Sequence, residues 1–189
     1  MNTSEIIAEA VRTLKEGGLI LYPTDTVWGI GCDATNPVAV AKVFALKKRS
    51  DSKSLVLLAC DMDMVARYVR RIPDIAIDLV EVNDKPMTLI YPDAQYLAPE
   101  VVAEDGSVGI RIPMSAFCVE MVRRFRRPVV STSANISGCP TPSRFDEIDS
   151  AIVKGVDYMV PESIGTCATG VASQIIKVEL DGQVKIIRA

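Results

Sequence analysis

The spacing of hydrophobic and polar residues predicts helices and strands that follow one another along the whole chain. Apolar residues at helical spacing predict a first helix that Asn2 or Ser4 can cap and that ends at Gly17-Gly18. A second helix is expected from Asn36-Pro37, because Asn is a favoured cap and Pro is tolerated in the first turn. Further helices are predicted from Asp61, from Pro73-Asp74 and over about 115–125. Short apolar runs predict strands at 19–22, 55–60, 87–91, 108–112, 128–131, 157–160, 174–179 and 184–188.

The order of these elements indicates the fold class. Asp181-Gly182 separates the last two strands and is typical of a hairpin turn. The irregular alternation of helices and strands favours a mixed sheet over a purely parallel one. The chain contains no repeat or low-complexity linker, and the stretch 133–143 is predicted to be a loop. We therefore expect a single α/β domain over residues 1–189, with a twisted mixed sheet flanked by helices.

Composition excludes several classes of protein. Of the 189 residues, 49% are hydrophobic and 24% are charged, which argues against disorder and fibrous structure. Apolar runs are too short to span a bilayer, and the N-terminus lacks the pattern of a signal peptide. These features predict a soluble, cytoplasmic protein with no membrane partner. The net charge of −3 argues against a wholly basic surface but permits a local basic groove.

The absence of histidine restricts the chemistry most strongly. With a histidine count of 0, Ser-His-Asp and Cys-His catalysis and histidine-based zinc sites are excluded. The five cysteines are scattered and form no C-x-x-C pair, so they are predicted to be small buried hydrophobic residues. No protein metal site is predicted.

Two phosphate-binding motifs are absent or incomplete. Gly29, Gly31 and Ala34 match the dinucleotide pattern G-x-G-x-x-A, but residues 23–26 separate them from the preceding predicted strand. We therefore do not interpret the match as a dinucleotide site. No Gly-Lys dipeptide occurs, which excludes a Walker-type loop.

Three polar clusters remain open to both a functional and a structural interpretation. Lys47-Lys48-Arg49, with Lys53 nearby, is either a solvated helix end or a phosphate-binding group. The sequence STSAN at 131–135 follows an apolar strand and could surround phosphate or carboxylate oxygens. The basic run 123–127 is either a solvated helix end, the favoured interpretation, or a contact for a polyanion.

Four motifs in order resemble one family. They are the PTDTVWG sequence at 23–29, the K-x-R sequence at 47–49, the R-x-P sequence at 111–113 and the S-x-N sequence at 133–135. Together they resemble the YrdC/Sua5 family, the threonylcarbamoyl-AMP synthases of tRNA modification. The resemblance extends from Gly17 to Arg188 and implies a YrdC-like fold without the extra C-terminal domain of Sua5 members.

The resemblance implies an enzyme, a nucleotidyltransferase that joins L-threonine, bicarbonate and ATP into threonylcarbamoyl-AMP and pyrophosphate. A carbamate formed from the substrates attacks the α-phosphorus, so no side-chain nucleophile is required, and Mg²⁺ accompanies ATP. The resemblance also implies tRNA or double-stranded RNA and downstream tRNA-modification proteins as partners. The alternatives are a double-stranded RNA or tRNA-binding module, and a paralogue that acts on another small substrate.

The motif match also implies the site residues. Lys47 and Arg49 would be catalytic and would hold the triphosphate. The remaining expected contacts to ATP are Lys53, Ser133, Asn135, Thr141 and Arg188, and those to threonine are Thr26, Arg111, Ser131 and Ser173. Because Lys47 lies at a helix end, its truncation is expected to cost little stability. The sequence departs from the family pattern at Ser50, Leu58 and Gln174.

Overall fold

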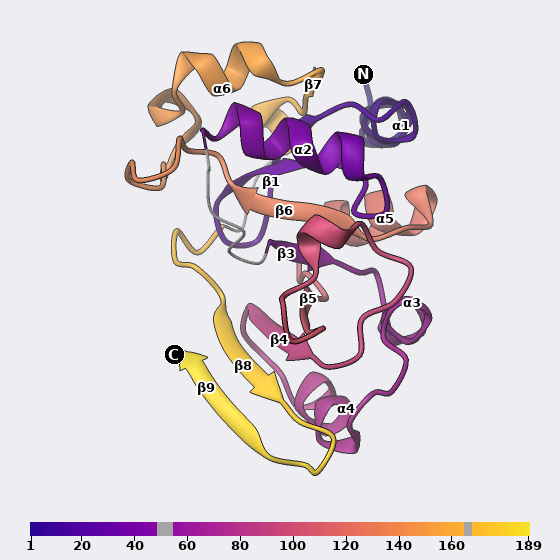
Figure 1. Cartoon of the computed structure of the whole chain (residues 1–189). Coiled ribbons are helices and arrows are strands. Elements are labelled where there is room, and N and C mark those ends of the chain that lie inside the picture. Colours follow the sequence, from indigo (N-terminus) through magenta and orange to yellow (C-terminus); the bar gives the residue numbers. More distant parts are fainter. Residues whose placement is uncertain (49–54, 165–167) are drawn as a thin grey trace.

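The computed structural model describes residues 1–48, 55–164 and 168–189. Within these ranges the strands form a nine-stranded mixed sheet in the order β7-β1-β2-β6-β3-β5-β4-β8-β9 (Figure 1). In chain order the strands are β1 (Ile20–Pro23), β2 (Trp28–Gly31), β3 (Val56–Leu58), β4 (Met87–Tyr91), β5 (Val108–Arg111), β6 (Val129–Ser133), β7 (Tyr158–Met159), β8 (Gln174–Val178) and β9 (Val184–Arg188).

Parallel and antiparallel pairs alternate irregularly across the sheet. β3 pairs with β5, β4 with β8 and β1 with β7 in parallel, and the other neighbours are antiparallel. β8 and β9 form the expected hairpin, in which Gly182 adopts the positive φ of 83° that favours glycine. The prediction of a mixed α/β sheet is therefore confirmed.

The helices flank this sheet in two groups. Helices α1 (Thr3–Lys15), α2 (Pro37–Leu46) and α6 (Ser150–Gly155) lie toward one end of the molecule (Figure 1). Helices α3 (Met62–Tyr68) and α4 (Asp74–Glu81) lie toward the other end, and α5 (Ala116–Phe125) packs against α1. Short 3-10 helices occur at η1 (Pro99–Val101), η2 (Phe145–Glu147) and η3 (Glu162–Ile164).

Capping residues begin the helices where the sequence predicts. Asn2, rather than Ser4, caps α1 in a capping box with Glu5. Asn36 caps α2 by accepting hydrogen bonds from the N–H groups of Val38 and Ala39. Each cap satisfies backbone donors that a helix start would otherwise leave without partners.

Two elements do not follow from the hydrophobic pattern. β2 contains two glycines in four residues, so its intrinsic strand preference is weak, and its pairing with β1 and β6 stabilises it. A Cβ at Gly31 would lie 2.8 Å from Tyr22 Cε1, so this glycine permits close strand packing. The next helix, α2, begins only at Pro37. Helix α6 is short and has a single buried residue, Ile152, which leaves almost no periodic signal.

The cysteine and membrane predictions can be checked directly on the described residues. Cys32, Cys60 and Cys118 are buried as predicted, whereas the prediction is wrong for Cys139, which is exposed in the loop after β6. Cys167 lies outside the described residues. Among the helices described, none is long and apolar enough to cross a membrane.

Candidate active site

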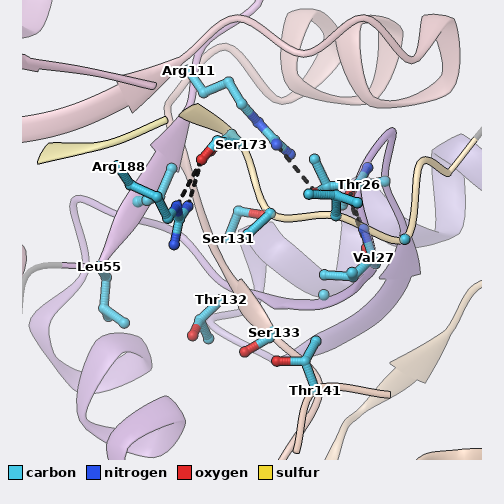
Figure 2. Close-up of a pocket in the computed structure, with 16 residues that line it drawn as sticks. Thr26, Val27, Leu55, Arg111, Ser131, Thr132, Ser133, Thr141, Ser173 and Arg188 are labelled. Atoms are coloured by element: carbon cyan, nitrogen blue, oxygen red, sulfur yellow. Dashed lines mark hydrogen bonds between the residues drawn. The ribbon is translucent and has the colours of Figure 1, made fainter. Parts of the chain in front are cut away.

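A cavity of about 510 Å³ lies where three sequence motifs meet, namely the PTDT, R-x-P and S-x-N motifs (Figure 2). Seven of the predicted site residues line it, namely Thr26, Arg111, Ser131, Ser133, Thr141, Ser173 and Arg188. Asn135 lines a neighbouring cavity of about 400 Å³, and Thr141 lines both. Lys47 lines neither cavity, and Arg49 and Lys53 lie outside the described residues.

Strand register explains why distant motifs converge. In β6, Ser131 and Ser133 lie two residues apart and therefore point to the same side of the sheet. Gly29 of β2 is directly opposite Ser133, and its missing side chain leaves space above the strand. Val56 of β3 is directly opposite Ser131 and completes this part of the lining.

Arg111 is held by a buried acidic partner. Its Nη2 lies 3.1 Å from Asp25 Oδ1, and its Nη1 donates a hydrogen bond of 3.1 Å to Thr26 Oγ1. The Arg111 and Asp25 side chains are 4% and 6% exposed, so each charge needs the other to offset its loss of solvation. Asp25 Oδ2 accepts a further bond from the N–H of Met114. Arg111 Nε is buried and has no hydrogen-bond partner among the described residues.

Sequence reasoning missed Asp25 as a site residue. The residue stands inside the PTDT motif between two threonines, and only Thr26 was predicted to contact a ligand. The backbone carbonyl of Asp25 also accepts a bond from the N–H of Thr169, and that of Thr26 accepts one from Gly170. These bonds attach the segment before Ser173 to the motif. Asp25 therefore positions the site instead of lining it.

A chain of hydroxyl groups determines whether Thr26 donates or accepts a hydrogen bond toward the cavity. Thr24 Oγ1 lies 2.7 Å from the carbonyl oxygen of Val27, and only the Thr24 proton can bridge these two oxygens. The 2.9 Å contact between Thr24 Oγ1 and Thr26 Oγ1 must then use the Thr26 proton. Because Arg111 also donates to Thr26 Oγ1, this oxygen offers a ligand only its remaining lone pair. Thr26 therefore acts as an acceptor toward the cavity.

Ser173 is positioned from both sides. Its hydroxyl lies 2.8 Å from Thr88 Oγ1 of β4, a buried residue that sequence reasoning did not single out. Arg188 of β9 donates from Nε and Nη2 to the Ser173 carbonyl at 2.9 and 2.7 Å (Figure 2). The last strand thus contributes a guanidinium group to the cavity wall, and this group also holds the backbone of Ser173 in place.

Lys47 occupies a different environment from the one its sequence position suggests. The side chain is buried, and its ammonium group donates to the carbonyl oxygens of Ser133 and Asn135, the latter at 2.7 Å. The interpretation of Lys47 as part of a solvated helix end is therefore wrong, because the chain after β6 folds back over the end of α2. Lys47 instead anchors the S-x-N motif.

The described residues that depart from the family pattern do not line the larger cavity. Leu58 is fully buried in the core, and Gln174 begins β8, where its N–H donates to the Pro86 carbonyl. Neither lines the larger cavity, to which Leu55, Val56 and Ser173 contribute. Ser50 lies outside the described residues.

The basic run at 123–127 carries several ion pairs. Arg123 and Arg124 both pair with Glu120, and Arg127 pairs with Asp33. Phe125 is buried against the core. The side chains of Arg123, Arg124 and Arg127 are 56%, 40% and 55% exposed, which agrees with the favoured interpretation of a solvated helix end.

The larger cavity is suited to binding anions. The described residues that line it include two arginines and several hydroxyl-bearing side chains but no aspartate or glutamate. Burial raises the pKa of nearby Tyr22 well above its usual range and that of Cys118 to about 12, so both remain protonated at neutral pH. Within residues 1–48, 55–164 and 168–189, no group of three or more His, Cys, Asp or Glu side chains could hold a metal ion. The arrangement can neutralise and orient anionic ligands.

Comparisons with known proteins agree with this geometry. The Sua5/YciO/YrdC family model, described as telomere recombination, matches residues 12–189. A threonylcarbamoyl-AMP synthase of Stenotrophomonas maltophilia (strain K279a) is 35% identical over 162 residues, which are 84% of this chain and 87% of that protein. A putative threonylcarbamoyl-AMP synthase of Methanocaldococcus jannaschii is 34% identical over 176 residues, 93% of this chain and 81% of that protein.

Solved structures show the same fold. P. abyssi Sua5 complexed with L-threonine matches with a TM-score of 0.81 and 24% identity over 94% of this chain. This chain covers 52% of that protein, or about half its length. E. coli YciO matches with a TM-score of 0.80 and 21% identity, covering 99% of this chain and 89% of that one. The fold, the order of the motifs and the extent of the family match lead to one conclusion: the chain belongs to the Sua5/YciO/YrdC family.

Proposed function

We propose that this chain is a cytoplasmic threonylcarbamoyl-AMP synthase. As a nucleotidyltransferase, it would convert L-threonine, bicarbonate and ATP into threonylcarbamoyl-AMP, pyrophosphate and water. The observation that carries this proposal is the cavity of about 510 Å³, in which residues of three motifs, together with Arg188 of β9, present two arginines and several hydroxyl groups. Relatives named threonylcarbamoyl-AMP synthase support the same assignment.

Threonine would occupy the part of the cavity bounded by Thr26, Arg111, Ser131 and Ser173. Arg111 lines the cavity, and its guanidinium group would pair with the substrate carboxylate. Thr26 Oγ1 is suited to a substrate donor, such as the threonine hydroxyl, because its own proton is directed toward Thr24. The complex of P. abyssi Sua5 with L-threonine is consistent with an amino-acid site in this fold.

ATP would extend from this site past Ser133 and Thr141, with Arg188 on the opposite wall. Arg49 and Lys53 follow α2 in the sequence and would neutralise the triphosphate, with Arg49 as the catalytic cation. Lys47, also predicted as an ATP contact, would act through the S-x-N motif that it anchors, and Asn135 would act through its hydrogen bond with Ser133. Mg²⁺ would enter bound to the phosphates, since no carboxylate of the described chain lines the larger cavity and Mg²⁺ is commonly held by substrate phosphates.

The reaction needs positioning more than a reactive side chain. The threonine amine and CO₂ from bicarbonate form a carbamate, whose oxygen attacks the α-phosphorus while pyrophosphate leaves with the electrons of the broken P–O bond. The protein would align these groups and neutralise the charge on the leaving pyrophosphate. A chain with 0 histidines is compatible with such a mechanism.

The proposal is tested by omitting substrates one at a time. Pyrophosphate release and a threonylcarbamoyl-AMP ion in mass spectra are expected only when threonine, bicarbonate and ATP are all present. Release that does not depend on threonine would instead support a paralogue acting on another small substrate. RNA binding without adenylate formation would support the RNA-binding module. Downstream tRNA-modification proteins would then consume the adenylate.

A further inference from the structure

A buried tyrosine lies behind the proposed threonine site. Tyr22 of β1 is fully buried, and its hydroxyl makes no hydrogen bond of standard geometry to a described residue. A buried hydroxyl without a partner lowers the stability of a fold, whereas phenylalanine would fill the same space without that penalty. Packing alone therefore does not explain why this position carries a phenol.

Two glycines of β2 leave Tyr22 a path toward the cavity. Tyr22 is directly opposite Gly29, and its ring leans along the sheet, so that a Cβ at Gly31 would lie 2.8 Å from its Cε1. From the other side, the register of β2 and β6 places Ser131 opposite Gly31, and a Cβ at Gly29 would lie 3.5 Å from Ser131 Oγ. All four residues point to the same face of the sheet. Both side chains thus extend over β2, where the glycines place no side chain between them.

The hydroxyl groups of Tyr22 and Ser131 face each other across this strand. Burial raises the pKa of Tyr22 well above its usual range, and the facing Ser131 hydroxyl partly opposes that rise. Ser131 also lines the larger cavity (Figure 2). The phenol therefore lies on the buried side of a serine whose other side faces the ligand.

This arrangement restricts the side-chain conformation of Ser131. A serine side chain has three staggered positions, and the one observed places Oγ near Gly29, which also lines the cavity. A hydrogen bond from the phenol would favour this position over the other two. A small movement of either hydroxyl is enough to complete that bond.

We propose that Tyr22 is a positioning residue for the amino-acid substrate, and that its hydroxyl holds the Ser131 hydroxyl over Gly29, where threonine meets it. The inference rests on the proposed function, because that function places threonine beside Ser131. Tyr22 touches no substrate atom in this arrangement and acts only through Ser131. Its loss should therefore weaken threonine binding and leave ATP binding unchanged.

The test is a double-mutant cycle that removes the two hydroxyl groups separately and together. Calorimetry measures dissociation constants for threonine and for ATP, and urea unfolding measures stability. Tyr22→Phe is expected to weaken threonine binding about threefold to tenfold, from the loss of bias among three side-chain positions to the loss of one hydrogen bond. In the Ser131→Ala background the same change should have no further effect. The unfolding midpoint of Tyr22→Phe should equal or exceed that of the wild type.

A second buried phenol provides the matched control. The hydroxyl of Tyr158 on β7 is also buried without a partner among the described residues, and Tyr158 lines neither cavity. Tyr158→Phe should therefore bind threonine and ATP like the wild type. A weakening of threonine binding in this variant equal to that in Tyr22→Phe would overturn the assignment, because the effect would then be general to buried phenols.

Two further results would overturn the inference. Unchanged threonine affinity in Tyr22→Phe, or the same loss of affinity in the Ser131→Ala background, would show that the phenol does not act through Ser131. An equal loss of ATP affinity, or a lower unfolding midpoint, would assign Tyr22 a structural role. Failure of the proposed function is distinguishable, because it would show as a wild-type protein that binds no threonine or releases no pyrophosphate from the three substrates.

Discussion

Arg111 and Asp25 form an ion pair of 3.1 Å whose two side chains are almost fully buried. The pair links the R-x-P strand to the PTDT segment, which are distant in the sequence and adjacent at the cavity. Arg111 also donates to Thr26, so the same guanidinium group connects the structural partner to a predicted substrate contact. Stability and substrate binding are therefore coupled at this point.

Loss of one member of this pair should be more harmful than loss of both. Asp25→Ala leaves the Arg111 charge buried without compensation and is expected to lower the free energy of unfolding by about 3–5 kcal/mol. The double variant Asp25→Ala/Arg111→Met removes both charges and should recover part of that stability, although it remains inactive. Urea denaturation of the three proteins measures the effect. Wild-type stability of Asp25→Ala would contradict the structural role of the pair.

Thr26 should distinguish substrates by their hydroxyl group. The wild type is expected to use threonine best, then serine, which lacks a methyl group, and 2-aminobutyrate least. Thr26→Val removes the acceptor and should reduce the preference for threonine over 2-aminobutyrate about tenfold, which corresponds to about 1.4 kcal/mol. Pyrophosphate release at fixed ATP and bicarbonate gives kcat/KM for each amino acid. An unchanged preference in Thr26→Val would assign hydroxyl recognition to another residue.

Replacement of Lys47 should lower the stability of the fold. The buried ammonium group bonds the carbonyls of Ser133 and Asn135, so Lys47→Met removes both bonds and should cost about 1–3 kcal/mol of unfolding free energy. The Ser133 carbonyl keeps the N–H of Asn135 as a donor, so most of the cost falls on the Asn135 carbonyl. This result differs from the expectation for a solvated helix end. Lys48→Met is the control, because the neighbouring Lys48 is exposed and should tolerate the change. Equal unfolding midpoints for the two variants would show that Lys47 is not a structural anchor.

The acid stability of the protein should include a contribution from Asp105. This carboxylate accepts bonds from Lys177 at 2.8 Å and from the hydroxyl and N–H of Ser107, which lower its pKa to about 2. Because the folded-state pKa is lowered, the stabilisation is present above about pH 4 and is lost as the pH falls toward 2. Partial exposure limits the effect to about 1 kcal/mol.

Asp105→Asn tests this contribution. The variant should be less stable than the wild type at pH 6, and the difference should vanish near pH 2, as followed by denaturant unfolding at each pH. A difference that stays constant across this range would assign the effect to packing instead of ionisation.

The cysteines should differ sharply in reactivity. Burial raises the pKa of Cys60 to about 11 and that of Cys118 to about 12, so at pH 8 almost no thiolate forms at either site. Cys139 is exposed and should react first with iodoacetamide in a Cys167→Ser background. Peptide mass spectra after timed labelling measure the order, and labelling in urea serves as the control. Rapid modification of Cys118 in the native protein would contradict its burial.

The sequence predicted most of the architecture because caps and apolar runs are local signals. Asn36 before Pro37 and the apolar run of β3 are examples in which neighbouring residues alone determine the element. β2 was missed because partner strands, not its own glycines, stabilise it. The motif match also identified seven of the residues that line the larger cavity.

Hydrogen-bond direction could not be predicted in the same way. The roles of Thr24, Asp25, Thr88 and Lys47 depend on which carbonyl or hydroxyl the fold brings within reach. Lys47, for example, is buried only because the chain after β6 returns over the end of α2. A motif specifies which side chains occur, whereas tertiary contacts decide which of their protons remain available.

The position of Arg188 on β9 has a consequence for how the cavity is assembled. Thr24 and Arg188 line the same cavity although they lie near opposite ends of the chain, so the complete wall forms only when these distant segments have come together. Contacts of such long sequence separation form late in folding, because their loop-closure entropy must be offset by structure already made. During synthesis a growing chain therefore lacks this wall until β9 has been translated. A ribosome-bound chain that ends before β9 would fold much of its core and still be unable to enclose a nucleotide.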